Sequence, residues 1–426
     1  MTDVLLVGGG GREHALAWKL ARSARLGRLV VAPGNPGIAA HAECVPVRDT
    51  AIDDLVALAR SERPDLVVVG PEAPLALGLG DRLRAAGFAV FGPSAAAARI
   101  ESSKAFSKDL MARHGVPTAR FRTFRDRAAA GRYCRALGAP LVVKADGLAA
   151  GKGVVICPTL DEAERALALC FEERAFGESG LTVVVEEFLE GEEVSFFALT
   201  DGAAVLPLAA AQDHKTIFDG DRGPNTGGMG AYSPAPIFDA AMQERVMADI
   251  VRPVVAALAK EGAPFAGVLY AGLMITREGP KVIEFNCRFG DPECQVLIPR
   301  LDDDLLPLLE AVATGRGLPA AVSWTPQASV CVVMASAGYP GVPRTGQPIT
   351  GTVEAAALPD VNVFHAGTAM ADGALVTAGG RVLGVQALAG DVAGAIRTAY
   401  QAVERIRFEG AQYRCDIGHR ALRRVG

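Results

Sequence analysis

Residues 3–20 read DVLLVGGGGREHALAWKL, an apolar run followed by four glycines and a stretch with helical spacing of apolar residues. The run predicts a buried strand, and the glycines predict a tight turn into a helix. Similar runs recur with helical patterns between them, which predicts a doubly wound parallel sheet. The predicted strands of this first unit span residues 3–7, 29–32, 66–69 and 88–91, and the unit should end near residue 100.

The glycine turn is similar to a dinucleotide-binding fingerprint but lacks two of its parts. The GxGxxG pattern places Glu13 where the third glycine should stand, and the shifted register places His14 there. The second strand ends in APGNPG (residues 32–37), with no carboxylate to hold a ribose. The turn keeps exposed N–H groups at a helix N-terminus, which bind phosphate. We therefore predict a site for a monophosphate or sugar phosphate, with a purely structural turn as the alternative.

Length, composition and charge limit the classes of function that the chain can have. The 426 residues carry a formal net charge of −5, are 50% hydrophobic and 21% charged, and include eight cysteines without a CxxC pair. This length predicts roughly two to four packed units. The charge gives no basic footprint for nucleic acid, and neither a membrane-spanning run nor a secretory signal is recognisable. We expect a cytoplasmic protein with reduced thiols that handles small molecules.

Two further units follow the first. Residues 101–324 combine helices with closely spaced strands and should form an α+β unit around a cleft. Residues 325–426 are strand-rich and close with a helix, which predicts a small third unit. The chain has no internal repeat and no low-complexity linker, so we expect the units to pack tightly. The predicted fold class is therefore a multidomain mixture of α/β and α+β units.

Two segments of the second unit suit a nucleotide. KADGLAAGKGV (residues 144–154) is a glycine-rich loop between two predicted strands, and such a loop can close over a polyphosphate. It is not a P-loop, because Gly153 follows Lys152 and no helix comes next. Downstream, VVVEEFLEGEEVS (residues 183–195) places glutamates at a strand end, where acceptors suit adenine and a carboxylate suits ribose. A solvated hairpin and an acidic turn are the alternatives.

VIEFNCRFGDPECQ (residues 282–295) gives the strongest local indication of chemistry. Glu284 and Asn286 alternate along a predicted strand and therefore share one face. Oxygen ligands with this spacing suit Mg²⁺, which keeps water ligands and bridges phosphates. Arg288 follows, and because buried charges need partners the group is hard to explain by packing alone. The segment 211–236 is long, glycine-rich and without periodicity, and we predict that it is an irregular substrate loop.

With these segments in view, the chain resembles the phosphoribosylamine–glycine ligase family (glycinamide ribonucleotide synthetases) of the ATP-grasp superfamily from end to end. RFGDPE (Arg288 to Glu293) and NTGGMGAYSP (Asn225 to Pro234) are its most specific motifs. The other matching segments are GGGGREHA, APGNPG, VVGPEAPL, FGPS, KADGLAAGKGV and EEFLEGEEVS, with weaker matches in ASAGYPG and HAGT. We expect the single-function form of the family and not a fusion.

The resemblance implies ATP-dependent ligation of glycine to 5-phosphoribosylamine, an early step of purine synthesis. ATP would convert the glycine carboxylate to glycyl phosphate, and the amine would attack it to give glycinamide ribonucleotide, ADP and phosphate. Such chemistry needs a dry site, positioning and charge neutralisation, and no protein nucleophile. The implied cofactors are ATP and Mg²⁺ or Mn²⁺. The implied partners are small molecules, with neither nucleic acid nor membrane; we expect a monomer that transiently contacts the preceding pathway enzyme.

The resemblance also implies roles for individual residues. Those expected to bind ATP are Lys104, Lys144, Gly151, Lys152, Gly153, Glu186, Glu187, Phe188, Leu189 and Glu193. Those expected to bind the other substrates are Gly9, Gly10, Gly11, Arg12, Asn35, Glu72, Asn225, Gly227, Gly228 and Asp291. The expected catalytic residues, which orient glycine or the developing acyl phosphate, are Arg288, Asp213 and Lys215, and the expected metal ligands are Glu284 and Asn286. Many ATP-grasp enzymes carry a further acidic ligand on the preceding strand, where this chain has Ala271 and Gly272.

Three other functions stay open at this point. Another ATP-grasp carboligase, such as a carboxyaminoimidazole ribonucleotide synthetase or a biotin carboxylase, would share the fold but not both specific motifs. A dinucleotide-dependent oxidoreductase is disfavoured by the missing acid after the second strand. A non-catalytic nucleotide sensor is disfavoured because Glu284 and Asn286 are both present.

Overall fold

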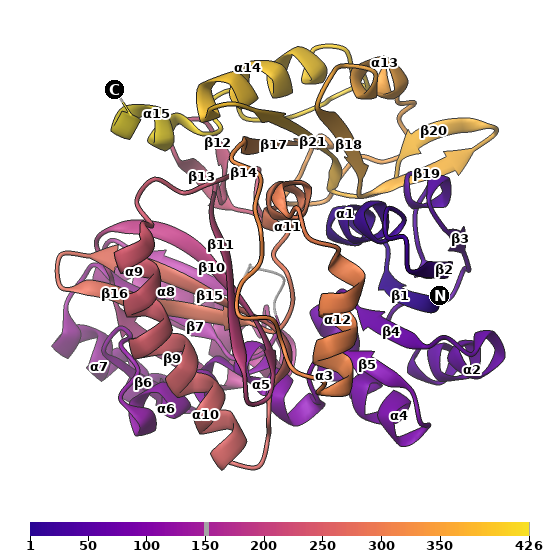
Figure 1. Ribbon diagram of the computed structural model, residues 1–426. Coiled ribbons are helices and arrows are strands. Elements are labelled where there is room, and N and C mark those ends of the chain that lie inside the picture. Colours follow the sequence, from indigo (N-terminus) through magenta and orange to yellow (C-terminus); the bar gives the residue numbers. More distant parts are fainter. Residues whose placement is uncertain (149–152, 426) are drawn as a thin grey trace.

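The computed structural model describes residues 1–148 and 153–425, and Figure 1 shows its ribbon. Its first unit is a parallel sheet in the order β3-β2-β1-β4-β5, which confirms the predicted sheet and adds the short edge strand β3. The strands are β1 (Thr2–Gly8), β2 (Leu26–Pro33), β3 (Glu43–Cys44), β4 (Leu66–Val69) and β5 (Ala89–Phe91). The helices are α1 (Gly11–Leu20), η1 (Ile38–Ala40), α2 (Ile52–Glu62), α3 (Glu72–Ala76), α4 (Leu79–Ala85) and α5 (Ala95–Ser102).

A four-stranded antiparallel sheet follows, in the order β6-β9-β7-β8. Its strands are β6 (Phe121–Phe124), β7 (Leu141–Ala145), β8 (Val154–Cys157) and β9 (Val183–Glu187). The helices of this region are α6 (Lys104–His114), α7 (Arg127–Leu137), α8 (Leu160–Phe171) and the 3₁₀ helix η2 (Gly177–Leu181). Helices α7 and α8 pack together, and their apolar faces form a small core with β7, β8 and β9.

An eight-stranded antiparallel sheet occupies the centre, in the order β16-β15-β10-β11-β14-β17-β21-β18. Its strands are β10 (Glu192–Asp201), β11 (Val205–Asp213), β14 (Gly230–Ser233), β15 (Ala266–Thr276), β16 (Gly279–Asn286), β17 (Ala328–Ala335), β18 (Val361–His365) and β21 (Arg381–Ala389). Because β14 pairs with β17, this sheet runs continuously across the division that we propose between residues 324 and 325.

The remaining helices surround this sheet (Figure 1). They are α9 (Ala240–Val246), the π-helix η3 (Met247–Val251), α10 (Arg252–Lys260), α11 (Glu293–Leu297), η4 (Ile298–Arg300), α12 (Leu305–Thr314), α13 (Thr352–Ala356), α14 (Val392–Val403) and α15 (His419–Val425). Two hairpins are formed by β12 (Thr216–Phe218) with β13 (Arg222–Asn225) and by β19 (Thr368–Ala371) with β20 (Ala374–Thr377). The segment 211–236 therefore contains strands, and the prediction of an irregular loop was wrong because short polar strands lack an apolar alternation.

Strand β1 belongs to two hydrophobic cores at once. Leu5 packs in the core that also contains Phe196 of β10, whereas Leu6 packs in the core that contains Phe197 of the same strand and Leu297 of α11. Alternate side chains of a strand point to opposite faces, so both faces of the first sheet are covered. The first unit and the central sheet consequently share their cores and pack tightly.

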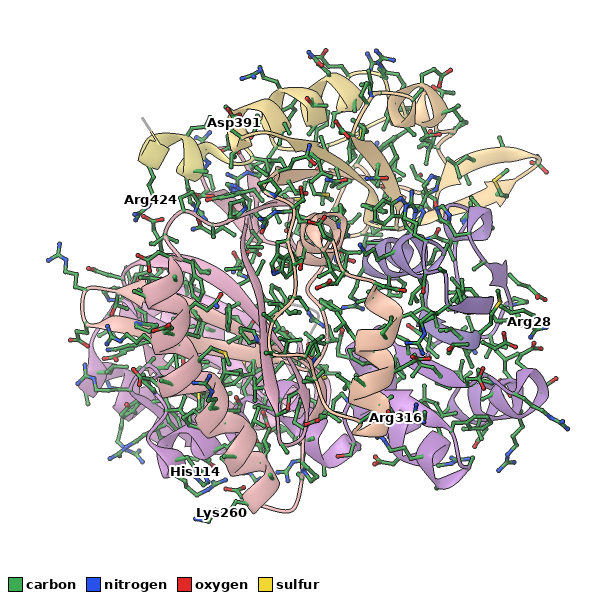
Figure 2. The ribbon with its side chains drawn as sticks, in the orientation of Figure 1. Arg28, His114, Lys260, Arg316, Asp391 and Arg424 are labelled. Atoms are coloured by element: carbon green, nitrogen blue, oxygen red, sulfur yellow. The ribbon has the colours of Figure 1, made fainter. Side chains whose placement is uncertain are left out.

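Exposed charged side chains cover the outside of the molecule. Arg28, Lys260 and Arg316 point away from the ribbon in Figure 2. Within the described ranges, every helix is too short or too polar to cross a membrane.

Two histidines join the first unit to the last. The backbone N–H of His365, at the end of β18, donates to Nδ1 of His14 on α1 at 2.7 Å, and their ring centroids lie 5.6 Å apart. Burial lowers the pKa of His365 to about 4. Burial, together with the charges of His365 and His41, also holds the pKa of His14 well below its usual value. Both rings are therefore neutral in the folded protein at neutral pH.

This contact predicts a pH-dependent stability. The unfolded chain protonates these histidines near pH 6.5, so the free energy of unfolding should fall as the pH drops from about 6.5 towards about 4. We expect the Tm to fall between about pH 7.5 and about pH 5, and His365→Asn to reduce that fall by about 2 °C. Calorimetry of both proteins across this range provides the measurement. A variant whose Tm falls as steeply as that of the wild-type protein would contradict the assignment.

Candidate functional site

A buried ion cluster lies where α6, β7 and β9 meet. Lys108 from α6 and Lys144 from β7 both pair with the carboxylate of Glu186, and each of the three side chains is at most 5% exposed. Burial alone would raise the pKa of Glu186, but the two ammonium groups bring it below its ordinary value. Burial lowers the pKa of Lys108 to about 8 in spite of this carboxylate. Two cations on one anion leave a net positive charge, which suits a phosphate group.

Lys108 was missed by the sequence analysis, although Lys104 on the same helix was predicted. The two residues are four apart on α6 and therefore lie on one helix face, which is a pattern that could have found Lys108. The ammonium group of Lys104 donates to the carbonyl of Gly147 at 2.8 Å. Asp146 accepts from the backbone N–H of Ala105 at 3.1 Å. The start of the glycine-rich loop is thus held against the N-terminus of α6.

The other residues predicted to bind ATP lie at the ends of β8 and β9. Gly153 is buried just before β8, and its carbonyl accepts from the backbone N–H of Ala145 at 2.8 Å. Glu187 ends β9, and its carboxylate accepts from Arg120 at 2.6 Å. The partly exposed Phe188 and Leu189 follow Glu187. The predicted residues Gly151 and Lys152 lie outside the described residues.

Lys215 lies between two carboxylates that the sequence analysis assigned to different roles. Its ammonium nitrogen lies 3.0 Å from Asp213 and 3.1 Å from Glu193. Although burial opposes the charge, these neighbours raise the pKa of Lys215 well above its ordinary value. Burial, together with the charge of Asp213, raises the pKa of Glu193. The end of β11 and the start of β10 therefore form one charged group.

The predicted metal ligands lie at the end of β16. Burial alone would raise the pKa of Glu284, but the nearby Lys215, Lys144 and Lys104 lower it, so this carboxylate is ionised. Asn286 accepts a hydrogen bond from Arg288 at 3.1 Å through its side-chain oxygen. Among residues 1–148 and 153–425, no three or more His, Cys, Asp or Glu side chains gather as a metal-binding group. One carboxylate and one amide oxygen fit a hard cation whose other ligands are water and phosphate.

Arg288 is held by four acceptors. Its guanidinium donates to Glu101 at 2.8 Å, to Glu72 at 3.1 Å, to Asn286 and to the carbonyl of Phe289 at 3.2 Å. Of its five N–H groups, these bonds leave one without an acceptor in the described part of the chain. Arg288 and Arg12 lower the pKa of Glu72 to about 2 although burial alone would raise it.

Glu101 was also missed by the sequence analysis. Its carboxylate accepts from Arg288 and from the backbone N–H of Cys287 at 2.7 Å. Burial raises the pKa of Glu101 even though Arg288 lowers it. In the sequence it is one glutamate at the end of a helix, and nothing local distinguishes it from a solvated residue. Its partners lie more than 180 positions away, so only the fold could reveal them.

The glycine turn contacts the RFGDPE segment directly. The Arg12 side chain is buried, donates to Glu13 at 2.6 Å and to the carbonyl of Phe289 at 3.1 Å, and lies 3.9 Å from Glu72. The N–H of Gly10 donates to Glu13 at 2.8 Å. A side chain at Gly9 would place its Cβ 2.5 Å from the carbonyl oxygen of Gly34. A second close approach involves Gly11, where a Cβ would lie 2.6 Å from Gln295 Nε2.

Asn35 has every side-chain hydrogen-bonding position in use. Its amide donates to the carbonyls of Gly9 and His365, each at 2.9 Å, and its oxygen accepts from the N–H groups of Gly37 and Ile38 at the same distance. An amide has two donors and two acceptor positions, so no capacity is left for a substrate in this arrangement. The structure places Asn35 behind the glycine turn, where it holds the backbone of that turn.

The glycine-rich segment after β13 packs against Asp291. Arg381 of β21, another residue that the sequence analysis missed, donates to the carbonyls of Gly227, Gly228 and Asp291. Gly228 has a φ of +113°, and a Cβ there would lie 2.4 Å from Pro292. Asp291 also accepts from Gln295 at 2.8 Å. Nearby, Asn225 pairs through its backbone with Thr216 in the β12–β13 hairpin.

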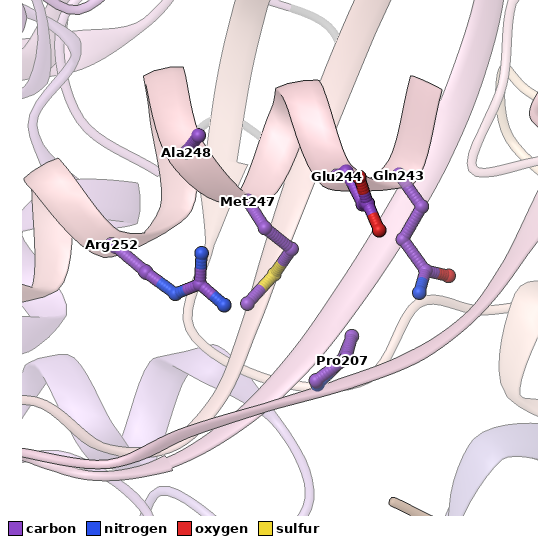
Figure 3. Close-up of a pocket in the computed structure, with 6 residues that line it drawn as sticks. All are labelled: Pro207, Gln243, Glu244, Met247, Ala248 and Arg252. Carbon is purple, nitrogen blue, oxygen red and sulfur yellow. The ribbon is translucent and has the colours of Figure 1, made fainter. Parts of the chain in front are cut away.

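A separate surface hollow of about 460 Å³ lies beside the helices α9 and α10 (Figure 3). It combines the apolar Met247 with the charged Glu244 and Arg252, and Pro207 lies on the opposite wall. These residues are not those predicted for the site. The cluster of buried charges described above is therefore the better candidate for chemistry.

Comparison with family models gives three matches along the chain. The phosphoribosylglycinamide synthetase N domain matches residues 2–101, the ATP-grasp (A) domain matches residues 102–294, and the C domain matches residues 329–420. A curated relative from Rhizobium meliloti (strain 1021), named phosphoribosylamine–glycine ligase, is 57% identical over 99% of both chains.

Solved structures resemble the chain at different levels of sequence identity. The phosphoribosylamine–glycine ligase of Thermotoga maritima is 32% identical, with a TM-score of 0.83 over 97% of this chain and 100% of that one. The biotin carboxylase domain of the Hydrogenobacter thermophilus 2-oxoglutarate carboxylase, in complex with MgADP, ADP and bicarbonate, has a TM-score of 0.75 at 18% identity. It covers 97% of this chain and 92% of its own, and this likeness shows the fold alone.

Proposed function

The chain belongs to the phosphoribosylglycinamide synthetase family, and from this premise we propose that it is an ATP-dependent carbon–nitrogen ligase. It joins glycine to 5-phosphoribosylamine in the synthesis of purines. The products are glycinamide ribonucleotide, ADP and phosphate. The cytoplasmic location, the monomeric state and a transient contact with the enzyme that supplies the amine are also part of this proposal.

One observation supports this function above the others: Arg12 of the glycine turn and Arg288 of the RFGDPE segment reach the same carboxylate, Glu72. The amine of the sugar phosphate must meet the activated glycine carboxylate, so the two binding regions must adjoin. The shared contact with Glu72 makes them adjacent. We assign the sugar phosphate to the turn from Gly9 to Arg12 and the glycine end of the reaction to Arg288.

The reaction proceeds in two transfers. A carboxylate oxygen of glycine attacks the γ-phosphorus of ATP, the bond to the β-phosphate oxygen breaks, and glycyl phosphate and ADP form. The amine nitrogen then attacks the carbonyl carbon, the phosphate leaves, and the nitrogen loses a proton as the amide forms. Both steps gain from cations fixed near developing negative charge, because such groups need no reorganisation. We assign this task to Lys104, Lys144 and Lys215.

We assign the two carboxylates near the lysines to the nucleotide. Glu186 and the backbone of residues 187–189 are the adenine side, and Glu193 is the ribose side. Glu193 is held by Lys215 at 3.1 Å, which couples the position of the nucleotide to the segment that carries Asp213. The loop from Lys144 to Val154 would cover the phosphates.

Glu284 and Asn286 would hold the divalent metal, Mg²⁺ or Mn²⁺. When bound, such a metal neutralises the phosphate charge and orients the transferred group. The carboxylate is kept ionised by the surrounding lysines, as metal binding requires. Gly272 lies opposite Glu284 in the β15–β16 pairing, in the region where an additional acidic ligand would stand in many relatives of the superfamily.

The thiols near the site do not provide a nucleophile. Burial raises the pKa of Cys287 well above its ordinary value, and Glu101 adds to this effect. Burial likewise raises the pKa of Cys294. A thiol is reactive as a thiolate, so both groups are inert at neutral pH. This agrees with direct attack of the amine on an acyl phosphate.

The function is tested by measuring ADP release with all substrates present and with each omitted in turn. We expect release to require glycine, 5-phosphoribosylamine and Mg²⁺ together, because the acyl phosphate forms productively only when the amine can consume it. ADP formation that is indifferent to glycine would contradict the proposal. Turnover that depends on bicarbonate would favour a carboligase of the same superfamily, and tight binding of NADH or NADPH would favour an oxidoreductase.

The metal assignment predicts that Glu284→Ala lowers kcat at least about 100-fold, since it removes the only carboxylate assigned to the metal. The Tm should stay within about 3 °C of the wild-type value. The matched control is Glu278→Ala at the β15–β16 turn, where the side chain is 78% exposed and pairs with Lys281. Rates near wild type in the Glu284 variant would place the metal elsewhere.

The sugar-phosphate assignment predicts that Arg12→Ala raises the KM for 5-phosphoribosylamine at least about tenfold, through loss of a charged hydrogen bond. The KM for ATP should change by less than about twofold, because in the described part of the chain the Arg12 side chain contacts Glu13, Glu72 and the Phe289 carbonyl, none of which we assign to the nucleotide. Steady-state kinetics with each substrate varied provides both values. Arg28→Ala, an exposed arginine on β2 of the same unit, is the control. A larger effect on ATP than on the amine would show that the site is misplaced.

A further inference from the structure

The C-terminal segment 414–420 is bonded to residues 213–221, the segment that carries two predicted catalytic residues. In Figure 1, α15 lies beside β12 and β13. The two segments are almost 200 positions apart in the sequence, yet side chains and backbone groups of each are bonded to the other. The roles assigned for the proposed reaction do not include this contact.

Arg414 is the centre of this contact. Its side chain is fully buried and forms two bonds of 2.7 Å with the carboxylate of Asp416. Its remaining nitrogen donates to Asp221 and to the hydroxyl of Thr216, both at 3.0 Å, and lies 3.3 Å from the carbonyl of Thr216. A buried charge is stable only when it is paired, so these acceptors fix the guanidinium in one place.

The residues that follow Arg414 continue the contact through backbone N–H groups and the carboxylate of Asp416. The N–H of Cys415 donates to Asp219 at 2.8 Å, and Asp416 accepts from the N–H of Gly220 at 2.9 Å. The N–H of Gly418 donates to Nε2 of the buried His214 at 3.0 Å.

Arg420 extends the contact to the two ends of the segment 213–221. It donates to the carboxylate of Asp221 at 2.8 Å and approaches the carbonyl of Asp213 at 3.4 Å. The segment is therefore anchored on both sides of Lys215, while the Lys215 side chain itself points to Asp213 and Glu193.

We propose that Arg414 is a positioning residue for the ligase reaction: it fixes the segment 213–221 so that Asp213 and Lys215 face Glu193 and the nucleotide. This inference rests on the proposed function. Arg414 touches no reacting atom and acts through Thr216 and Asp221. A shift of about 1 Å in a positioning group is enough to lower a rate by about 100-fold.

The test replaces Arg414 by methionine, which keeps the unbranched inner part of the side chain and removes the guanidinium with its bonds. Arg414→Met should lower kcat for glycine-dependent ADP release at least about tenfold. Hydrogen exchange should become faster in residues 213–225 and stay unchanged in β17 and β21. The control is Arg397→Met, on the exposed face of α14. A folded Arg414 variant with the kcat of the wild-type protein would overturn the proposal.

A double-mutant cycle separates positioning from general destabilisation. If Arg414 acts through the placement of Lys215, the effect of Arg414→Met should be at least about threefold smaller in a Lys215→Arg background than in the wild-type one. Equal effects in the two backgrounds would overturn the proposal. Failure of the wild-type protein to release ADP with glycine and 5-phosphoribosylamine would instead refute the proposed function.

If Arg414→Met does not fold, Asp221→Asn provides the same test. Asp221 is 37% exposed and accepts from both Arg414 and Arg420, and the substitution preserves its volume. We expect kcat to fall at least about threefold, with faster exchange in residues 213–225. An unchanged kcat together with faster exchange would show that the segment does not need this anchor, which overturns the proposal.

Discussion

The carboxylate of Glu72 joins two parts of the site, the glycine turn and the RFGDPE segment. It accepts from Arg288 at 3.1 Å and lies 3.9 Å from Arg12, so it separates two guanidinium groups whose other carboxylate partners are Glu101 and Glu13. Like charges in such a poorly solvated place repel strongly. Glu72 opens α3 directly after β4, and its position is therefore set by the parallel sheet. The order of strands in the first unit thus decides where the glycine turn meets the end of β16.

On the nucleotide side, one carboxylate again pairs with two cations. Lys108 and Lys144 share the carboxylate of Glu186, so these three side chains together carry a net positive charge. Confining cations in this way costs desolvation energy, which a polyphosphate offsets when it binds. Glu284 stays ionised only because lysines surround it. Phosphate and metal are therefore expected to support each other's binding.

Much of the fold could be predicted from the sequence, because buried parallel strands are uninterrupted apolar runs and the glycines mark their turns. Local spacing also predicted that Glu284 and Asn286 share one face of a strand. Lys108 was within reach through its four-residue spacing from Lys104. Glu101, Arg381 and Arg414 were not, because each is bonded to partners that lie 90 or more positions away in the sequence. Local sequence patterns show which residues share a face of a helix or strand, but they do not show which distant residues pair with one another.

Some side chains of the site have every hydrogen-bonding position occupied, and others do not. The first kind shapes the site, and the second kind is free to bind a ligand. The side chain of Asn35 has all its donor and acceptor positions occupied by backbone groups, so in this arrangement it holds the turn. Lys104 uses one of its three N–H donors, on Gly147, and Arg288 keeps one N–H free of acceptors in the described ranges. A partly buried cation with unused donors is well suited to bind an anionic ligand. The unused donors of these charged side chains therefore indicate where the substrates bind.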